Sequence, residues 1–361
     1  MSRRRLDGRA VRRGLVFATL LGFAVACLAV LPLPRPRLAP REGPAIADVH
    51  AWGYQLQRAE ASRIGGDVDL MVIDHSADGT AASAFSPRHV AEFRARAKAV
   101  VGTQGSNDTR PRLVLAYMSV GEAEAYRYYW SLQWSKSAPS WLGPENKDWK
   151  RNYLVRFWEP GWQQVIVELR PSALRRLLER PLQWHKPYLD RIIEAGFDGV
   201  YLDRVDAFEA WSAERGSAER DMVAFVKSIS AYAKARRPGF LIVPQNGEEL
   251  LVHADYRSAI DAVAKEDLLY GLAGDEIRNS EDDVASTLAF LDQARAARLP
   301  VLVVEYLRDS ERRFEAAARL DELGFLALFT SRKLNLPPEP RPARSRPAAV
   351  GTSPPPAVGT R

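Results

Sequence analysis

The sequence predicts an α/β protein built as a single (β/α)8 TIM barrel, and three observations support this. Short apolar segments alternate with helical patterns from residue 52 to residue 330, which is typical of parallel strands covered by helices. The apolar segments are almost wholly hydrophobic, so both faces of each strand are expected to be buried. About 290 residues of this repeat, with no G-x-G-x-x-G or phosphate loop after the first strand, favour a barrel over an open nucleotide-binding sheet.

Nine apolar segments have the length and composition of strands. They are residues 52–56, 68–74, 113–118, 153–158, 197–202, 240–245, 262–266, 301–305 and 325–330. Helical patterns lie between them at residues 87–101, 160–195, 219–237, 282–297 and 310–323. Nine strands are one more than the barrel needs, so we expect the first or the last segment to be an extension outside it.

The segment 196–206, G-F-D-G-V-Y-L-D-R-V-D, gives the clearest functional signal. Its apolar run stops abruptly at Asp203 and Asp206. A buried parallel strand that ends in acids brings carboxylates to the carboxyl edge of the sheet, where the active sites of barrels lie. We therefore expect Asp203 in the site, whereas Asp206 is expected to cap the following helix.

The amino-terminal region has the pattern of a targeting segment. Residues 1–13 contain six arginines and precede an apolar run at residues 14–33. That run is close to the ~20 residues that span a bilayer, which indicates a signal peptide or an uncleaved membrane anchor. The arginines predict a cytoplasmic amino terminus and an extracytoplasmic barrel, either secreted or anchored to the membrane. A lipoprotein signal ending at Cys27 is the alternative.

Composition divides the rest of the chain into three parts. Residues 34–48 are expected to form a proline-rich linker and residues 49–335 the barrel. Residues 336–361 are rich in proline and arginine, and this composition predicts a disordered tail because it offers little apolar surface to bury.

The charge distribution argues against a nucleic-acid partner. The chain has 51 basic and 45 acidic residues, but residues 1–43 carry nine basic against two acidic residues, and residues 336–361 carry four against one. Residues 44–335 therefore hold 38 basic and 42 acidic residues, which leaves no basic stripe for phosphate backbones. A mildly acidic barrel favours a neutral or cationic ligand. The single cysteine, Cys27, excludes an intrachain disulfide and a Cys-based zinc site.

Polar side chains, most of them acidic, follow nearly every predicted strand. They include Asp74, His75, Tyr117, Glu122, Glu124, Trp158, Asp203, Gln245, Glu248, Glu266 and Glu305. In a barrel these positions converge on one mouth. Carboxylates crowded together cannot all ionise without cost, so some pKa values are expected to rise, as a general acid beside an ionised partner requires. Paired carboxyl groups of this kind are typical of glycoside hydrolysis.

A metal site is the main alternative, because these carboxylates together with His75 could bind Mg²⁺ or Ca²⁺. The chain has five histidines but no H-E-x-x-H or H-x-H pair, which argues against catalytic zinc. The absence of a G-x-S-x-G elbow argues against a serine nucleophile. We therefore expect neither a metal nor a cofactor.

Seven motifs, in order along the chain, resemble glycoside hydrolase family 114, the endo-α-1,4-polygalactosaminidase group. They are W-G-Y-Q-L-Q (52–57), D-L-M-V-I-D (69–74), A-Y-M-S-V-G-E-A-E-A-Y-R-Y-Y-W (116–130), W-L-G-P-E-N (141–146), V-R-F-W-E-P-G-W (155–162), G-F-D-G-V-Y-L-D-R-V-D (196–206) and P-Q-N-G-E-E-L (244–250). The resemblance implies a (β/α)8 barrel that cleaves an α-1,4-linked, galactosamine-rich polysaccharide. It also implies that Asp203 is the catalytic aspartate and Glu266 the catalytic glutamate, with Glu248 and Glu305 as rivals.

The resemblance suggests a division of labour at the barrel mouth. Asp203 is expected to act as nucleophile or charge stabiliser, and Glu266 as proton donor. Substrate contacts are expected from Asp74, Tyr117, Glu122, Trp158, Gln245, Glu248 and Glu305, with Tyr128 and Trp130 as further stacking candidates. Structural alternatives exist: Asp74 bonding loop amides, Trp158 in the core at the barrel top, and Tyr128 and Trp130 packed as a loop cover. The competing functions are a non-catalytic polysaccharide-binding barrel of the cell envelope and a metal-dependent hydrolase.

Overall fold

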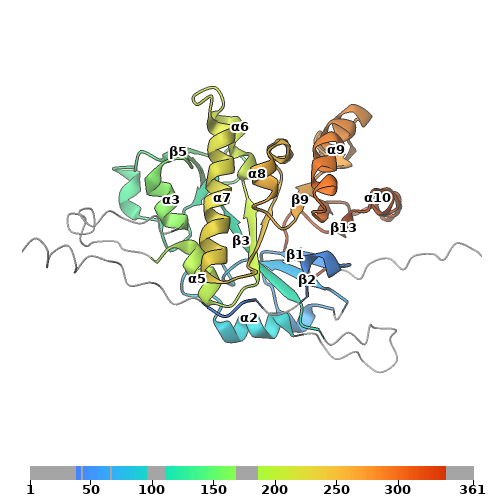
Figure 1. The fold of residues 1–361 in the computed structure, drawn as a ribbon, viewed down its shortest axis with the longest axis horizontal. Helices are drawn as coiled ribbons and strands as arrows, with labels where there is room; N and C mark the ends of the chain where they lie inside the picture. Colours follow the sequence, from blue (N-terminus) through green and yellow to red (C-terminus); the bar gives the residue numbers. More distant parts are fainter. Residues whose placement is uncertain (1–37, 42–43, 66, 96–109, 168–185, 339–361) are drawn as a thin grey trace, which may run out of the picture.

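The computed structural model describes residues 38–41, 44–65, 67–95, 110–167 and 186–338 (Figure 1). The predicted signal or anchor at residues 14–33 and the basic segment before it lie outside the described residues, as do residues 339–361 of the predicted tail. In the part of the chain that is described, no helix is both long and apolar enough to cross a membrane.

Eight parallel strands form the barrel. They are β1 (Trp52–Gln55), β2 (Leu70–Ile73), β3 (Leu113–Ser119), β7 (Gly199–Asp203), β8 (Leu241–Pro244), β9 (Val263–Glu266), β12 (Val301–Glu305) and β13 (Leu326–Phe329). Hydrogen bonds join β1–β2–β3–β7–β8 and β9–β12–β13 in those orders. A bridge from Gln245 to Ala264 connects β8 to β9, and the Trp52 indole donates to the Leu326 carbonyl oxygen (2.8 Å), connecting β1 to β13. The parallel barrel predicted from the sequence is therefore present.

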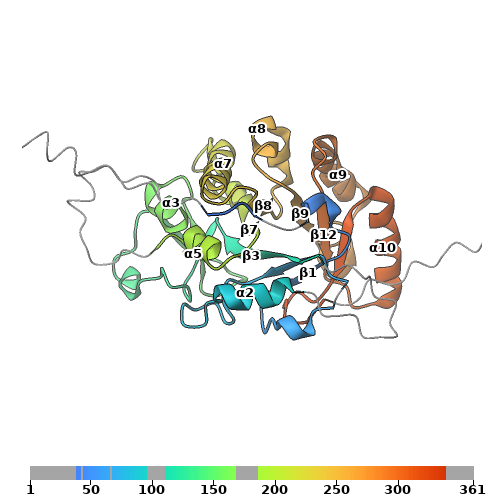
Figure 2. The ribbon, with the colours of Figure 1, turned by 60° about the horizontal axis from the view of Figure 1, so that its bottom comes forward.

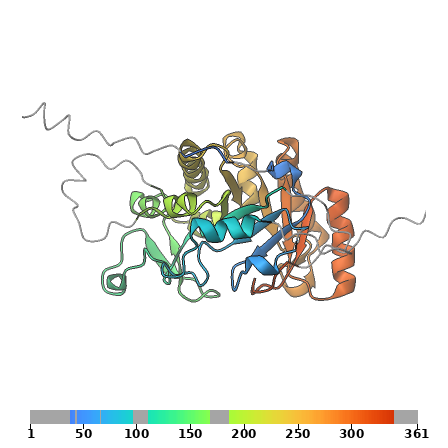
Figure 3. The same cartoon turned by 90° about the horizontal axis from the view of Figure 1, so that it is seen from below.

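We expected the surplus strand to be the first or the last predicted segment, but it is the fourth. Residues 153–155 of the segment predicted at 153–158 fall in β6 (Asn152–Val155), which pairs antiparallel with β4 (Glu122–Glu124) and β5 (Leu142–Glu145) outside the barrel. Most of β6 is only half-buried, because it lies outside the barrel, whose strands are buried by helices on one face and by the barrel interior on the other. Figure 3 shows this green segment beside the barrel, on the side opposite the orange α10. A second antiparallel pair, β10 (Tyr270–Gly271) and β11 (Gly274–Arg278), follows β9.

Helices surround the strands on the outside of the barrel (Figure 2). They are α2 (Pro87–Arg94), α3 (Pro160–Ile166), α5 (Tyr188–Glu194), α6 (Phe208–Trp211), α7 (Ala218–Arg236), α8 (Ala254–Arg257), α9 (Glu281–Ala296) and α10 (Ser310–Leu323). The 3-10 helices are η1 (Ile46–Asp48), η2 (Ala61–Arg63), η3 (Leu132–Ser135), η4 (Val205–Ala207) and η5 (Glu248–Val252). Side chains cap several helices: Ser280 accepts from the Asp283 amide (3.1 Å) and Asp309 from the Arg312 amide (2.9 Å).

The long helices predicted at residues 219–237, 282–297 and 310–323 are confirmed as α7, α9 and α10. The helix predicted at 87–101 starts as expected and ends at Arg94, with residues 96–109 outside the described part. The helical pattern predicted at 160–195 is helical at its two ends, where α3 begins at Pro160 and α5 ends at Glu194, and residues 168–185 between these helices lie outside the described part. Val167 leaves α3 in extended backbone, and Pro187 precedes α5 in non-helical geometry, because proline disfavours a continuing helix.

Side chains on the barrel strands alternate between two hydrophobic cores. Residues such as Val72, Tyr201 and Val304 point into the barrel, whereas their neighbours Met71 and Val303 pack beneath the helices. Successive side chains of a strand point to opposite faces, so each inward series continues two residues further at the carboxyl end. This alternation decides which strand-end residues reach the barrel mouth.

Candidate active site

A cavity of about 680 Å³ opens at the carboxyl ends of the barrel strands. Its volume is in the range of ligand-binding clefts, which is ~300–1,000 Å³. Six polar residues of its wall come two residues after an inward-facing core residue of a strand: Asp74, Tyr117, Asp203, Gln245, Glu266 and Tyr306. Both predicted catalytic residues and four predicted contact residues, Asp74, Tyr117, Glu122 and Gln245, therefore line this cavity.

Asp203 ends β7, and three donors hold its carboxylate in place. Its Oδ2 accepts from the Tyr117 hydroxyl (2.6 Å), which reaches it from the neighbouring strand β3. Its Oδ1 accepts from the backbone amide of Arg204 (2.8 Å) and from Nε2 of Gln245 (3.3 Å). The carboxylate is therefore fixed in orientation at the floor of the cavity.

Glu266 ends β9, two strands away from Asp203, with β8 between them. Its Oε1 accepts from Nδ2 of Asn246 (2.9 Å), and its Oε2 accepts from the Tyr306 hydroxyl (2.9 Å). Adjacent amide side chains at the end of β8 thus hold the two acids, Gln245 holding Asp203 and Asn246 holding Glu266. We did not predict Asn246 or Tyr306 as site residues, although the Q-N pair at the end of a strand was a signal for the first.

Burial and the negative charge of Glu266 raise the pKa of Asp203 to about 7, against the opposing effect of the Tyr117 hydrogen bond. Burial also raises the pKa values of Tyr117 and Tyr306 well above the usual range, so both remain hydroxyl donors. The pair of carboxyl groups can therefore hold a proton near neutral pH, as the crowding of acids at the strand ends predicted.

The residues that directly follow Asp203, Gln245 and Glu266 have left-handed backbone geometry. Arg204 has a φ of 62°, Asn246 of 59° and Asp267 of 56°, and each comes directly after a cavity residue. This conformation is uncommon for residues other than glycine and persists only where the surroundings impose it. Ion pairs fix two of the three: Arg204 pairs with Glu122 (3.1 Å), and Asp267 pairs with Arg332 (2.9 Å).

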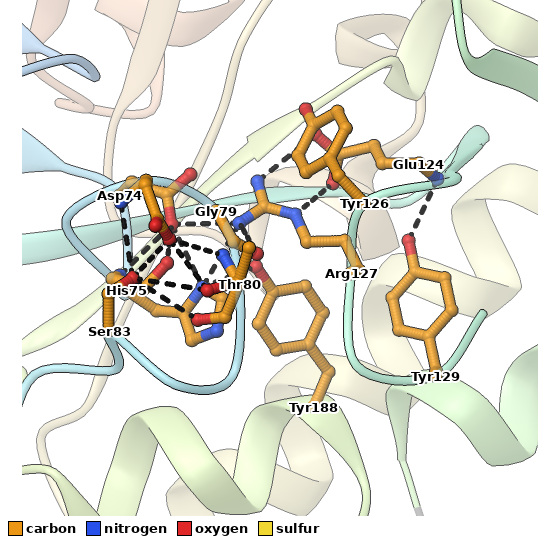
Figure 4. A network of polar contacts seen from close by, with 12 residues as sticks. Asp74, His75, Gly79, Thr80, Ser83, Glu124, Tyr126, Arg127, Tyr129 and Tyr188 are labelled. Carbon is orange, nitrogen blue, oxygen red and sulfur yellow. Dashed lines mark hydrogen bonds and ion pairs between the residues drawn. The ribbon is translucent and has the colours of Figure 1, made fainter.

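Asp74 belongs to a buried network of ion pairs on one wall of the cavity (Figure 4). Arg127 donates through Nη1 to Asp74 (2.8 Å) and through Nε to Glu124 (2.6 Å). Burial alone would raise the pKa of Asp74, but the charge of Arg127 and a hydrogen bond with His75 outweigh it, and the pKa is lowered. Asp74 also accepts a hydrogen bond from the Ser76 backbone amide (3.0 Å), as expected if it stabilises the loop rather than contacting substrate. Its carboxylate therefore holds the loop after β3 against β2.

Glu122 lines the cavity but is almost fully buried and committed to neighbouring side chains. It accepts from Nδ2 of Asn146 (2.7 Å) and pairs with Arg204 (3.1 Å). It thereby connects the β5–β6 turn to the loop that follows Asp203. Direct substrate contact was expected of Glu122, whereas its observed partners are protein groups.

Three expected contact residues lie outside the cavity wall. Trp158 packs edge-to-face on Trp211 (5.6 Å between ring centres), in agreement with the alternative that it belongs to the core. Glu248, in η5, pairs with Lys265 (3.3 Å). The third is Glu305, which lies on the same outward face of β12 as Val301 and Val303. Its carboxylate accepts a hydrogen bond from the Leu269 amide (2.7 Å). Burial raises its pKa to about 8.

Tyr128 and Trp130 also lie away from the cavity wall. The Tyr128 ring packs on Tyr188 (5.8 Å), and Trp130 packs on Tyr153 (4.9 Å). Both residues therefore form part of a packed loop cover, the alternative to a sugar platform. Asp206, expected to cap a helix, instead lies in η4 without a capping bond and pairs with Arg204 (3.1 Å).

The position of Glu305 gives a first testable prediction. Glu305→Gln is expected to keep turnover close to that of the unmodified protein, because the side chain bonds the Leu269 amide and does not line the cavity. The measurement is kcat/KM on a cleaved oligosaccharide, with Glu266→Gln as the matched substitution inside the cavity. Loss of turnover in both variants would mean that the alternation of the strands does not select the catalytic glutamate.

The wall of the cavity is not acidic, although residues 44–335 as a whole hold slightly more acidic than basic residues. Its six acidic side chains are Asp74, Asp78, Glu122, Glu124, Asp203 and Glu266. They share the wall with seven basic side chains: Arg58, Arg127, Lys150, Arg151, Arg204, Arg332 and Lys333. Among the described residues, no group of three or more His, Cys, Asp or Glu side chains is arranged to hold a metal ion.

A parallel (β/α)8 barrel with carboxylates gathered at the carboxyl ends of its strands is the architecture of a barrel glycoside hydrolase. The chain belongs to the glycoside-hydrolase family GH114, whose model matches residues 35–341. It is a glycoside hydrolase, as the resemblance of its motifs implied.

Curated relatives extend over most of the chain. It is 35% identical over 280 residues to the uncharacterized protein MJ1477 of Methanocaldococcus jannaschii, covering 75% of this chain and 70% of that one. It is 34% identical over 276 residues to an uncharacterized protein of Thermotoga maritima, covering 74% of each chain. An uncharacterized protein of Deinococcus radiodurans is 32% identical over 312 residues, which are 84% of this chain and 87% of the relative.

Among solved structures, the chain is similar to the glycoside hydrolase domain of PelA from Pseudomonas aeruginosa. The TM-score is 0.54 at 20% identity, over 80% of this chain and 96% of that domain. A variant of the same domain with one glutamate replaced by alanine gives the same values. At this identity the likeness shows a shared fold.

Proposed function

We propose that this protein is an endo-acting hydrolase that cleaves an α-1,4-linked, galactosamine-rich polysaccharide. The observation that carries the proposal is the centre made by Asp203 and Glu266, each held by one amide side chain of β8 at the floor of an open cavity. Family membership supports hydrolysis of a glycosidic bond. The polymer is inferred from the resemblance of the motifs to the endo-α-1,4-polygalactosaminidase group.

In this proposal Asp203 acts as the nucleophile or charge stabiliser and Glu266 as the proton donor. The three hydrogen bonds that Asp203 accepts favour its ionised form, which is the form that stabilises a developing oxocarbenium ion. Glu266 gives its proton to the leaving oxygen as the glycosidic C–O bond breaks. Water then supplies the hydroxyl group of the new reducing end, and its remaining proton returns to Glu266. Since the two groups are coupled, a proton on Glu266 removes one cause of the raised pKa of Asp203.

The proposed site of action is outside the cytoplasmic membrane. The six arginines of residues 1–13 and the apolar run at residues 14–33 support export, either as a secreted protein or with a membrane anchor. A polysaccharide is the proposed partner in that compartment, and no nucleic acid is expected there.

The test is incubation of the purified protein with defined α-1,4-linked oligomers of galactosamine and N-acetylgalactosamine, followed by mass spectrometry. Internal cleavage is expected, giving fragments of intermediate length before monomers. Turnover is expected to survive a chelator, and loss of turnover on chelation would instead support a metal-dependent hydrolase. A shift in polymer mobility without any shortening would overturn hydrolysis of this polymer and support a binding barrel.

A further inference from the structure

Trp149 combines strong exposure with a place in the wall of the cavity. Seven large apolar side chains of the described residues are strongly exposed: Leu132, Trp149, Val252, Leu272, Ile277, Phe314 and Leu336. Of these seven, Trp149 alone lines the cavity, and 57% of its surface is accessible. Water contact of a large indole ring is unfavourable, and its place in the wall of the cavity would allow a bound ligand to cover it.

The turn that carries Trp149 is ordered by its own hydrogen bonds. It joins β5 to β6 in the antiparallel sheet beside the barrel. Oδ1 of Asn146 accepts from the backbone amides of Asp148 (2.9 Å) and Trp149 (3.2 Å). The Asn152 amide in turn donates to the Trp149 carbonyl oxygen (3.2 Å). The backbone of Trp149 is therefore fixed before any ligand arrives, which lowers the entropic cost of binding.

The buried side chain of Glu122 connects this turn to the loop that follows Asp203. Nδ2 of Asn146 donates to Glu122 (2.7 Å), and Glu122 pairs with Arg204 (3.1 Å), the residue after Asp203. The side chain of Glu122 is only 2% exposed, so these contacts are shielded from water. Asn146 thus orders the backbone of Trp149 through its Oδ1 atom and connects the turn to Glu122 and Arg204 through its Nδ2 atom.

We propose that Trp149 is the stacking platform of an outer sugar subsite that binds a ring of the polysaccharide remote from the bond being cleaved. The proposal rests on the function inferred above and adds to it a binding place for a further sugar of the polysaccharide. The face of a hexose carries C–H groups that pack on a flat aromatic ring, while its hydroxyl groups stay in water at the rim. Asn146 and Glu122 act as positioning residues for this platform.

The test compares Trp149→Ala with Phe314→Ala, which removes an equally exposed aromatic ring from α10, outside the cavity. In Trp149→Ala, kcat/KM is expected to fall about tenfold on long oligomers through KM, with kcat on the shortest cleaved oligomer unchanged. Trp149→Phe is expected to recover part of the loss, and Asn146→Ala to reproduce it. Equal kinetics of Trp149→Ala and Phe314→Ala on long oligomers would overturn the subsite.

A binding measurement separates this inference from the proposed reaction. In an Asp203→Asn background, where turnover is expected to stop, the affinity for long oligomers is measured with and without Trp149→Ala. A weaker affinity without the indole ring supports the subsite even if the unmodified protein cleaves none of the oligomers tested. An unchanged affinity rejects the subsite and leaves the assignment of Asp203 and Glu266 intact.

Discussion

Asp203→Asn is expected to lower kcat by about 10³-fold or more while the protein stays folded. The substitution removes the negative charge that the developing oxocarbenium ion requires, and it keeps the size of the side chain. The measurement is product formation from the long oligomer, with the far-UV circular dichroism spectrum as the check on folding. Turnover within about tenfold of the unmodified protein would remove Asp203 from the catalytic pair.

The pH dependence of catalysis follows from the same residue. The reaction needs one proton on the pair of carboxyl groups, so kcat/KM is expected to fall as the pH rises through the value of about 7 to which burial and the charge of Glu266 raise the pKa of Asp203. A value of kcat/KM that instead rises through about pH 7 would mean that the reaction needs both carboxyl groups ionised, which would contradict a proton donor in the pair. Glu266→Gln provides the complementary test, because an aryl glycoside with an acidic leaving group needs little protonation and is expected to restore turnover in that variant.

Asp203 also predicts a gain in stability that accompanies the loss of function. Its pKa is about 7 in the folded protein, and an unfolded aspartate has a pKa of about 4. Between these values the folded state binds more protons than the unfolded state, so this residue lowers the stability as the pH rises. Asparagine carries no such penalty.

Unfolding experiments in urea can measure this gain. The free energy of unfolding of Asp203→Asn is expected to exceed that of the unmodified protein on the order of 1–4 kcal/mol at about pH 8, with a smaller difference at about pH 5. A difference that is the same at both pH values would contradict the raised pKa. The comparison needs no substrate, so its result is independent of the polymer that the enzyme cleaves.

The barrel and its centre could be predicted because their signals are local. Apolar strands ending in acids identify the carboxyl edge of the sheet, and Asp203 and Glu266 lie there as expected. The structure then sorts the remaining acids by the alternation of side chains along each strand. Glu266 follows inward-facing Ala264, whereas Glu305 follows outward-facing Val303. This rule could have excluded Glu305 from the sequence, provided that the phase of each strand was known.

The parts that could not be predicted depend on contacts between distant segments. The segment containing Tyr153 is apolar and ends in Glu159, so it has the same local pattern as a barrel strand. Its antiparallel pairing with β4 and β5 is a tertiary choice that no local pattern reveals. The same holds for Trp149, whose place in the cavity wall follows from a turn that Glu122 holds through Asn146, 24 residues away along the chain.

Arg127→Met is expected to be the most destabilising substitution considered, by about 3–5 kcal/mol at neutral pH. The side chain of Arg127 is 1% exposed and pairs with Asp74 and Glu124, whose carboxylates are also buried. Methionine would leave both of these largely buried negative charges without the positive charge that neutralises them (Figure 4). Arg88→Met is the matched control, because the exposed Arg88–Glu92 pair on α2 contributes at most about 1 kcal/mol.

The pH dependence of this loss distinguishes an electrostatic cause from a packing defect. Arg127 lowers the pKa of Asp74 in the folded protein, so the stability that this pair contributes is present above the unfolded pKa of about 4 and is lost as the pH falls below it. In Arg127→Met the buried carboxyl groups can relieve the penalty only by taking up protons. The deficit, measured by urea unfolding, is therefore expected to shrink from about pH 7 to about pH 5. Adding Asp74→Asn and Glu124→Gln is expected to recover much of the stability at about pH 7, whereas a deficit that persists in the triple variant would assign the loss to packing.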